Sequence, residues 1–214
     1  MFWFEPPDQH LGWTYKVPGA LDNNFISNIE NYSIANPTKL RPAEILNDKL
    51  GLETAYRRTD IMWLDDMNSF PDLYKQIIDI AMTVNNQYFK YNLCYIEPLQ
   101  YSVYKEDNLG NYDIHCDSNL RNTSGFNRKI SFSIMLNDPS EFEGGELKFH
   151  YLKDPVVAEL NKGDMILFPS FIPHTHPTKL RLTPLVTGAT LCGMNDGNKI
   201  MSPLFNSATT GSFK

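Results

Sequence analysis

The sequence has few cysteines, no excess of positive charge and no long apolar run. Its three cysteines, Cys94, Cys116 and Cys192, are widely spaced and odd in number, which matches neither a disulfide framework nor a zinc site built from cysteine pairs. The formal net charge of -6 disfavours unspecific binding to nucleic-acid phosphates or anionic lipid, although a local basic groove stays open. No stretch reaches membrane-spanning length, and residues 1–7 lack the basic and apolar segments of a leader peptide. We therefore expect a soluble, unprocessed, cytoplasmic protein.

The chain has enough apolar residues for one substantial core, with 214 residues and 42% hydrophobic content. Two amphipathic helices are predicted before residue 90. The apolar stripe of the first consists of Leu21, Phe25, Ile29 and Tyr32. The second helix has Pro71 in its first turn and ends near Phe89, and its stripe consists of Leu73, Ile77, Ala81, Val84 and Tyr88. Residues 37–48, with two prolines, are predicted to be a loop.

From about Tyr91 onward, short apolar segments alternate with turn residues, which is typical of antiparallel strands. The predicted strands are residues 99–104, 112–117, 129–136, 146–151, 156–160, 165–168 and 182–186. Gly163 and Asp164 favour a hairpin turn before residue 165. Helices followed by many strands indicate an α+β, mainly β protein, with the helices on the outside of a sandwich or barrel.

His115 and Asp117 carry the strongest chemical signal in the sequence. Two residues apart on a predicted strand, their side chains leave the same face. Such a pair supplies two ligands of a facial triad, and the third must be a histidine from elsewhere in the fold, His174 or His176. This donor set leaves three adjacent positions on an octahedral iron, enough for a chelating organic acid and dioxygen. A His-X-Asp tripeptide also arises by chance, and a strand histidine bonded to a carboxylate needs no metal.

Four ordered blocks of the sequence resemble the prolyl-hydroxylase-like branch of the 2-oxoglutarate- and Fe(II)-dependent oxygenases. They are Tyr104 ahead of residues 112–117 in the pattern Tyr…Tyr-X-X-His-X-Asp, residues 128–138, the Gly-Gly turn in residues 142–147, and residues 163–170 leading to a late histidine. The resemblance spans roughly residues 99–193.

The resemblance implies a double-stranded β-helix, or jelly-roll barrel, with supporting N-terminal helices. It implies a single domain over residues 1–214, with a helical part at 1–92, the jelly-roll core at 93–193 and a tail at 194–214. Its metal ligands would be His115, Asp117 and His174; His174 is preferred to His176 because its spacing from residues 168–170 is that of the family. The implied cofactors are Fe(II), 2-oxoglutarate as cosubstrate and dioxygen, with ascorbate as a further expected reductant.

The same resemblance calls for a basic residue on a late strand to pair the distal carboxylate of 2-oxoglutarate. Arg181 is the expected anchor, although it lies closer to His174 than is usual in the family. Lys179 is the alternative, and Thr190, which another alignment puts at that place, cannot pair a carboxylate. Tyr104 is expected to offer its hydroxyl to the cosubstrate.

By this likeness the protein is predicted to hydroxylate an unactivated C–H bond of a peptide, a protein or a small molecule. Neither a nucleic acid nor a membrane is an expected partner, and the sequence does not determine the oligomeric state. Three alternatives stay open. They are a non-catalytic binding module on the same barrel, a cupin-like metalloenzyme without 2-oxoglutarate, and a related nucleic-acid demethylase, which the acidic balance and the lack of a second arginine after His174 disfavour.

Overall fold

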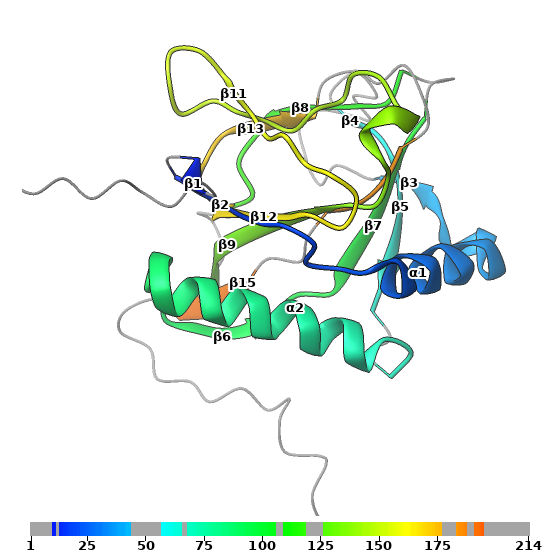
Figure 1. Ribbon diagram of the computed structural model, residues 1–214, viewed down its shortest axis with the longest axis horizontal. Helices are drawn as coiled ribbons and strands as arrows, with labels where there is room; N and C mark the ends of the chain where they lie inside the picture. Colours follow the sequence, from blue (N-terminus) through cyan, green and yellow to red (C-terminus); the bar gives the residue numbers. More distant parts are fainter. Residues whose placement is uncertain are drawn as a thin grey trace, which may run out of the picture.

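The computed structural model describes residues 10–11, 13–43, 57–65, 68–105, 109–118, 126–176, 183–187 and 191–194. Two antiparallel sheets face each other, and two helices lie along the outer side of the larger sheet (Figure 1). No helix in this part of the chain is long and apolar enough to cross a bilayer.

The larger sheet has ten strands, with the main order β1-β2-β12-β9-β14-β7-β5-β3 and with β15 and β6 attached beside β9. Its strands are β1 His10–Leu11, β2 Thr14–Val17, β3 Arg41–Pro42, β5 Asp60–Leu64, β6 Leu93–Ile96, β7 Leu99–Tyr104, β9 Phe126–Met135, β12 Met165–Pro169, β14 Thr183–Thr187 and β15 Leu191–Met194. The smaller sheet has five strands in the order β11-β10-β13-β8-β4. These are β4 Arg57–Arg58, β8 Asn111–His115, β10 Lys148–Phe149, β11 Val156–Val157 and β13 His174–His176.

From β7 onward the chain alternates between the two sheets, with β7, β9, β12 and β14 in the larger and β8, β10, β11 and β13 in the smaller. This winding is that of a jelly roll, in agreement with the predicted barrel. Every predicted strand has a counterpart. Alternation of apolar and polar residues marks strands such as β7, whereas β12 is a continuous apolar run that is buried throughout. The short strands β13 and β15, and the strands β1 to β6 before them, were not predicted as strands.

The part of the chain before residue 93 contributes strands as well as helices. β2 pairs with β12, and β5 pairs with β7. Both additions extend the larger sheet at strands that would otherwise be its edges, where unpaired backbone groups would be exposed. The predicted loop at 37–48 contains the 3₁₀ turn Pro37–Lys39 and β3 in its described residues.

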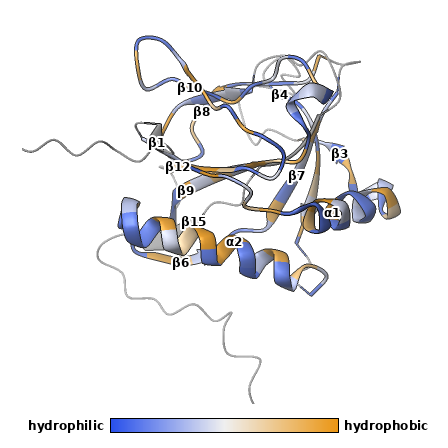
Figure 2. Ribbon diagram, in the orientation of Figure 1, coloured by the Kyte–Doolittle hydropathy of each residue, from blue (hydrophilic) through white to orange (hydrophobic). Residues whose placement is uncertain are grey.

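Both predicted helices are present. In α1, Asn23–Ala35, the carboxylate of Asp22 accepts hydrogen bonds from the backbone N–H groups of the first turn. α2, Pro71–Val84, continues into the π-helical turn Asn85–Phe89. Figure 2 shows apolar and polar residues alternating along α2 as an amphipathic helix requires. The predicted stripe is buried as far as Val84, whereas Tyr88, in the π-helical turn, is 38% exposed and packs on Tyr15 of β2 with ring centres 5.7 Å apart.

The core has two parts, one on each side of the larger sheet. Even-numbered residues of β9 and odd-numbered residues of β12 face the helices. Examples are Ile130, Ile134, Met165 and Leu167. A second cluster fills the space between the sheets and contains Tyr104, Met135, Phe149, Ile166 and Phe168. Ser131 and Ser133 are buried on that inner face of β9, so the interior is polar on this part of β9.

The turn at residues 161–164 differs from the predicted hairpin. The backbone N–H of Asp164 donates to the carbonyl of Asn161, as in a β-turn. However, the turn joins β11 in the smaller sheet to β12 in the larger, so it crosses between sheets. Turn chemistry specifies a reversal of the chain but not which strands pair afterwards.

We expect Gly163→Ala to destabilise the fold more than Gly19→Ala. Both glycines have positive φ, +85° and +59°, but a Cβ at Gly163 would lie 2.3 Å from the carbonyl oxygen of Leu21, whereas nothing lies within 4 Å of one at Gly19. The strained backbone alone costs about 1 kcal/mol, and the clash adds about 1–3 kcal/mol. Urea unfolding of the two variants measures the difference, and equal losses would contradict the close approach of residue 163 to Leu21.

Candidate metal-binding site

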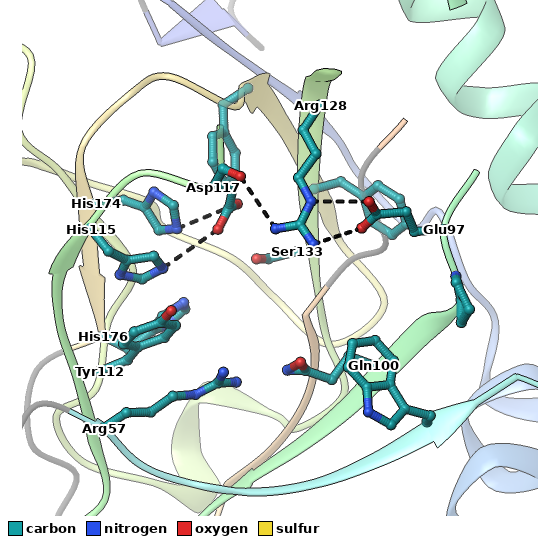
Figure 3. A pocket seen from close by; sticks show the side chains of 14 residues that line it. Arg57, Glu97, Gln100, Tyr112, His115, Asp117, Arg128, Ser133, His174 and His176 are labelled. Atoms are coloured by element: carbon teal, nitrogen blue, oxygen red, sulfur yellow. Dashed lines mark hydrogen bonds and ion pairs between the residues drawn. The ribbon is translucent and has the colours of Figure 1, made fainter. Parts of the chain in front are cut away.

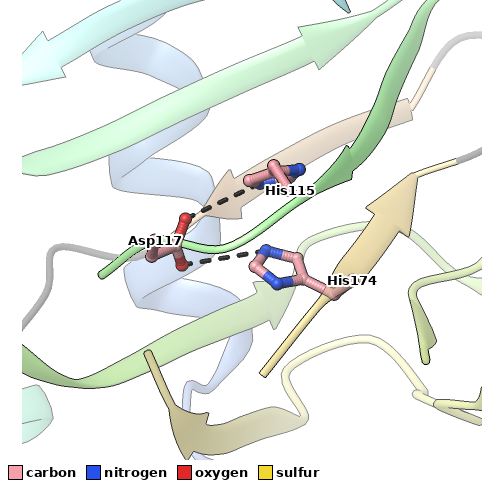
Figure 4. Close-up of side chains that lie close together, drawn as sticks. All are labelled: His115, Asp117 and His174. Atoms are coloured by element: carbon pink, nitrogen blue, oxygen red, sulfur yellow. Dashed lines mark ion pairs between the residues drawn. The ribbon is translucent and has the colours of Figure 1, made fainter. Parts of the chain in front are cut away.

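His115, Asp117 and His174 converge between the sheets. His115 is the last residue of β8, and Asp117 follows it two residues later. β13 pairs antiparallel with β8 in a register that sets His174 directly opposite His115. Figure 4 shows the two imidazoles and the carboxylate directed toward one another. Strand pairing between residues far apart in the sequence therefore assembles the cluster.

The distances within this cluster suit one shared ion. Nε2 of His115 lies 3.6 Å from Oδ1 of Asp117, and Nε2 of His174 lies 3.7 Å from Oδ2 of the same carboxylate. All three ligand atoms lie within 4.8 Å of one another. Donors bound at about 2.1 Å in adjacent positions around an ion would be roughly 3 Å apart, so small side-chain rotations would complete the set.

Both imidazoles are held in the form that a metal requires. Nδ1 of His115 lies 2.7 Å from the carbonyl oxygen of Asp113, and Nδ1 of His174 lies 3.0 Å from that of Ile172. Because a carbonyl oxygen only accepts hydrogen bonds, Nδ1 carries the proton in each neutral ring and donates it. Nε2 then keeps its lone pair and faces the carboxylate. Such a hydrogen bond to the second ring nitrogen is typical of metal-binding histidines.

The electrostatics of the cluster favour the same protonation states. Burial and the neighbouring His174 lower the pKa of His115 to about 4, against the raising effect of Asp117. Burial alone would raise the pKa of Asp117, but His174, His115, a hydrogen bond from Ser131 and the charge of Arg128 hold it below its ordinary value. At neutral pH His115 is therefore uncharged and Asp117 is ionised, as metal binding demands.

A partly exposed ion pair between Arg128 and Glu97 supports Asp117 from the larger sheet. Nη1 of Arg128 donates to the backbone carbonyl of Asp117 at 3.2 Å. The same guanidinium contacts both carboxylate oxygens of Glu97, at 2.9 Å from Nη2 and 3.1 Å from Nε. This bidentate pair fixes the orientation of Arg128 and thereby the segment that carries Asp117.

The two late histidines differ in their surroundings. Both are buried in β13 and line the same cavity. Their ring centres are 6.3 Å apart and their planes are nearly perpendicular, while the pairing register with β8 shifts between them. His176 packs on the ring of Tyr104 at 5.4 Å, whereas His174 lies beside His115 at 4.1 Å. Of these two, the geometry brings His174 into the cluster.

Tyr104 lies next to the cavity and is fully buried. Burial raises the pKa of its hydroxyl, against the lowering effects of Arg57 and of a hydrogen bond with Thr59. The described residues that line the cavity do not include Tyr104. Its predicted contact with a cosubstrate stays a prediction.

A cavity of about 200 Å³ adjoins the cluster (Figure 3). Its polar lining comes from both sheets and consists of Arg57, Glu97, Gln100, Tyr112, His115, Asp117, Arg128, Ser133, His174 and His176. The predicted anchors Arg181 and Lys179, and Thr190 of the alternative alignment, lie outside the described residues. The described strand β14 contains no lysine or arginine.

Sequence reasoning missed Arg57 and the Glu97–Arg128 pair. From the sequence, Arg57 is expected at the surface or in the core, and its strand β4 is two residues long, too short for a periodic pattern. Arg128 opens one of the family-like blocks and could have been noticed there. Its pairing with Glu97 depends on contacts between strands that are distant in sequence.

Residues 99–183 match the model of the 2OG-Fe(II) oxygenase superfamily. Curated relatives include a PKHD-type hydroxylase of Teredinibacter turnerae, 32% identical over 96 residues, or 44% of this chain and 39% of the relative. Another from Aliarcobacter butzleri is 33% identical over 88 residues, or 39% of this chain and 36% of that protein. The matched segment thus spans less than half the length of these relatives.

Solved structures with the same arrangement include a Pseudomonas putida prolyl-4-hydroxylase, with a TM-score of 0.65, 20% identity and coverage of 84% of this chain and 92% of that one. A Trichoplax adhaerens prolyl hydroxylase gives a TM-score of 0.68, 14% identity and coverage of 85% and 84%. These likenesses establish the double-stranded β-helix fold. Together with the family match, they show that residues 99–183 are similar to the 2OG-Fe(II) oxygenase superfamily and that the fold is similar to that of prolyl hydroxylases.

Proposed function

We propose that this chain is an Fe(II)- and 2-oxoglutarate-dependent dioxygenase that hydroxylates an unactivated C–H bond in a peptide or protein substrate. The observation that carries the proposal is the convergence of His115, Asp117 and His174 beside a polar cavity. Two imidazoles and one carboxylate on one side of an ion leave adjacent positions for a chelating acid and dioxygen. A closed zinc site with four protein ligands would leave no such space.

The proposed roles follow from what each residue contacts. His115, Asp117 and His174 would hold Fe(II), with the backbone carbonyls of Asp113 and Ile172 fixing the two rings. When bound, iron and 2-oxoglutarate supply the oxidation chemistry, and the protein positions them and excludes water. Phe168 closes the inner side of the cluster, since its ring centre lies 4.8 Å from that of His174.

The peptide substrate rests on likeness to relatives. The Trichoplax adhaerens structure is described as a complex with a hypoxia inducible factor peptide fragment, and another neighbour of similar fold is described as a viral collagen prolyl hydroxylase. We extend this substrate class to the present chain as part of the proposal. We also propose that residues 1–214 form one domain, since β2 and β5 pair with core strands.

One observation favours a second candidate, a metal-binding jelly roll that does not use 2-oxoglutarate. The expected anchor Arg181 lies outside the described residues, and the described β14 contains no lysine or arginine. Such a protein would bind a metal without any dependence on the acid.

The test is to follow 2-oxoglutarate consumption by Fe(II)-loaded protein under oxygen, with proline-containing peptides as candidate substrates. We expect succinate formation that requires both iron and oxygen, and a weak visible charge-transfer band when the acid is added without oxygen. Metal-loaded protein that shows neither succinate nor the band would refute the proposal and favour the second candidate.

A further inference from the structure

Among the described residues, the cavity has one arginine whose charge is paired with a carboxylate and one for which no carboxylate partner is found. Arg128 is held by both oxygens of Glu97. Within the part of the chain that the structure describes, no carboxylate lies at ion-pair distance from Arg57, and its buried Nε has no hydrogen-bond partner there. An unpaired charge in a partly buried site favours binding of an anion from solution.

Strand pairing places Arg57 on the same wall as the metal cluster. β4 pairs with β8, and Arg57 stands opposite Tyr112. The guanidinium carbon of Arg57 lies 4.4 Å from the centre of the Tyr112 ring. On that same ring stacks His115, with centres 3.5 Å apart and planes inclined by 15°. Because both groups contact the Tyr112 ring, the guanidinium carbon of Arg57 lies close to the His115 ring, at most the sum of these two distances from its centre.

Figure 3 shows the guanidinium of Arg57 directed into the cavity, toward the side chain of Gln100 on the facing sheet. The neighbouring Arg58 is used differently. Its Nε donates to the side-chain oxygen of Asn111 at 2.8 Å, and it does not line the cavity within the described residues. The two adjacent arginines therefore form a natural pair of test and control positions.

We propose that Arg57 binds the distal carboxylate of the 2-oxo dicarboxylic acid whose other end chelates the metal. This inference rests on the proposed function and names the residue that recognises the cosubstrate. The length of the acid fits, because the terminal carbons of an extended five-carbon dicarboxylate are about 5 Å apart. A guanidinium offers two parallel N–H donors to a carboxylate, which a single ammonium cannot do. Tyr112, stacked beneath it, holds the guanidinium plane in place.

The test compares two ligands in the absence of oxygen. 2-Oxoglutarate is titrated against 2-oxopentanoate, which has the same carbon chain and the same chelating end but no distal carboxylate. Binding to Fe(II)-loaded protein is followed by the charge-transfer band, and binding to the Mn(II) form by calorimetry. Neither readout depends on turnover. The proteins are the full chain and its Arg57→Met, Arg57→Lys and Arg58→Met variants.

We expect Arg57→Met to weaken 2-oxoglutarate binding about ten- to a hundred-fold, the effect of losing charge-assisted hydrogen bonds. Binding of 2-oxopentanoate should change less than about twofold, because the substitution leaves the chelating end untouched. Arg58→Met should retain the preference of the wild type for 2-oxoglutarate. Arg57→Lys should lose several-fold in 2-oxoglutarate affinity, since its single ammonium makes fewer contacts.

The outcomes separate this inference from the proposed function. If the wild type binds 2-oxoglutarate and Arg57→Met keeps both that affinity and the preference over 2-oxopentanoate, Arg57 is not the anchor. If the metal-loaded wild type binds neither acid, the proposed function fails as well. Melting curves and Mn(II) affinity verify the fold of each variant. Should Arg57→Met not fold, unchanged 2-oxoglutarate affinity in Arg57→Lys overturns the inference.

Discussion

Replacing Asp117 with alanine is expected to weaken Fe(II) binding by more than about a hundred-fold, because even outer partners of metal ligands typically contribute ten- to a hundred-fold. Asp117 is the carboxylate that both imidazoles face, at 3.6 and 3.7 Å. Without it, two neutral rings would have to hold a divalent cation with no compensating negative charge. The change is measured by Mn(II) or Fe(II) titration under anaerobic conditions, and the charge-transfer band with 2-oxoglutarate should disappear.

Asp113→Ala is the matched control for this experiment. Asp113 is an exposed carboxylate on the same strand, and its side chain accepts a hydrogen bond from the backbone N–H of Ile114. Its backbone carbonyl, which orients His115, remains in the variant. Metal affinity within about threefold of the wild type is expected for a surface substitution of this kind. Equal losses in Asp113→Ala and Asp117→Ala would show that the effect comes from disruption of β8.

His174→Ala and His176→Ala are expected to separate by more than about tenfold in metal affinity. His174 lies in the cluster, and its Nδ1 is anchored on the carbonyl of Ile172. His176 is equally buried but packs on Tyr104. We expect His174→Ala to lose metal binding by about a hundred-fold or more, in line with the loss of a direct ligand, and His176→Ala to retain most of it.

The comparison between these variants controls for packing, because both remove a buried imidazole from the same short strand. Thermal unfolding of the two apo proteins should therefore show similar losses, while metal-induced stabilisation should survive only in His176→Ala. Metal-induced stabilisation that survives in His174→Ala and is lost in His176→Ala would make His176 the third ligand.

Local periodicity explains how much of the fold could be predicted. Strands such as β7 and β9 alternate apolar and polar residues because one face of each is buried against the helices. The helical stripe of α2 follows the same logic with a period near 3.6. Short strands such as β4 and β13 have too few residues to show a period, and their positions depend on pairing with β8.

Part of the candidate site could also be predicted from local spacing. His115 and Asp117 are two residues apart, so an extended backbone brings their side chains together without help from the rest of the fold. The family-like blocks then indicated a late histidine. The role inferred for Arg57 could not be predicted, because its approach to the cluster depends on the pairing of β4 with β8 and on the ring of Tyr112.

By itself, the sequence determined the types of metal donor available, the order of the helices and strands, and the resemblance that points to an oxygenase. These properties depend on residue chemistry and on spacings of a few residues, so they do not depend on how the rest of the chain folds. The family-like spacing favoured His174 over His176, but the approach of His174 to the carboxylate and the presence of one paired and one unpaired arginine among the described cavity residues are set by the tertiary structure. Both depend on the register between strands that are far apart in sequence, and such pairing leaves no local pattern to read.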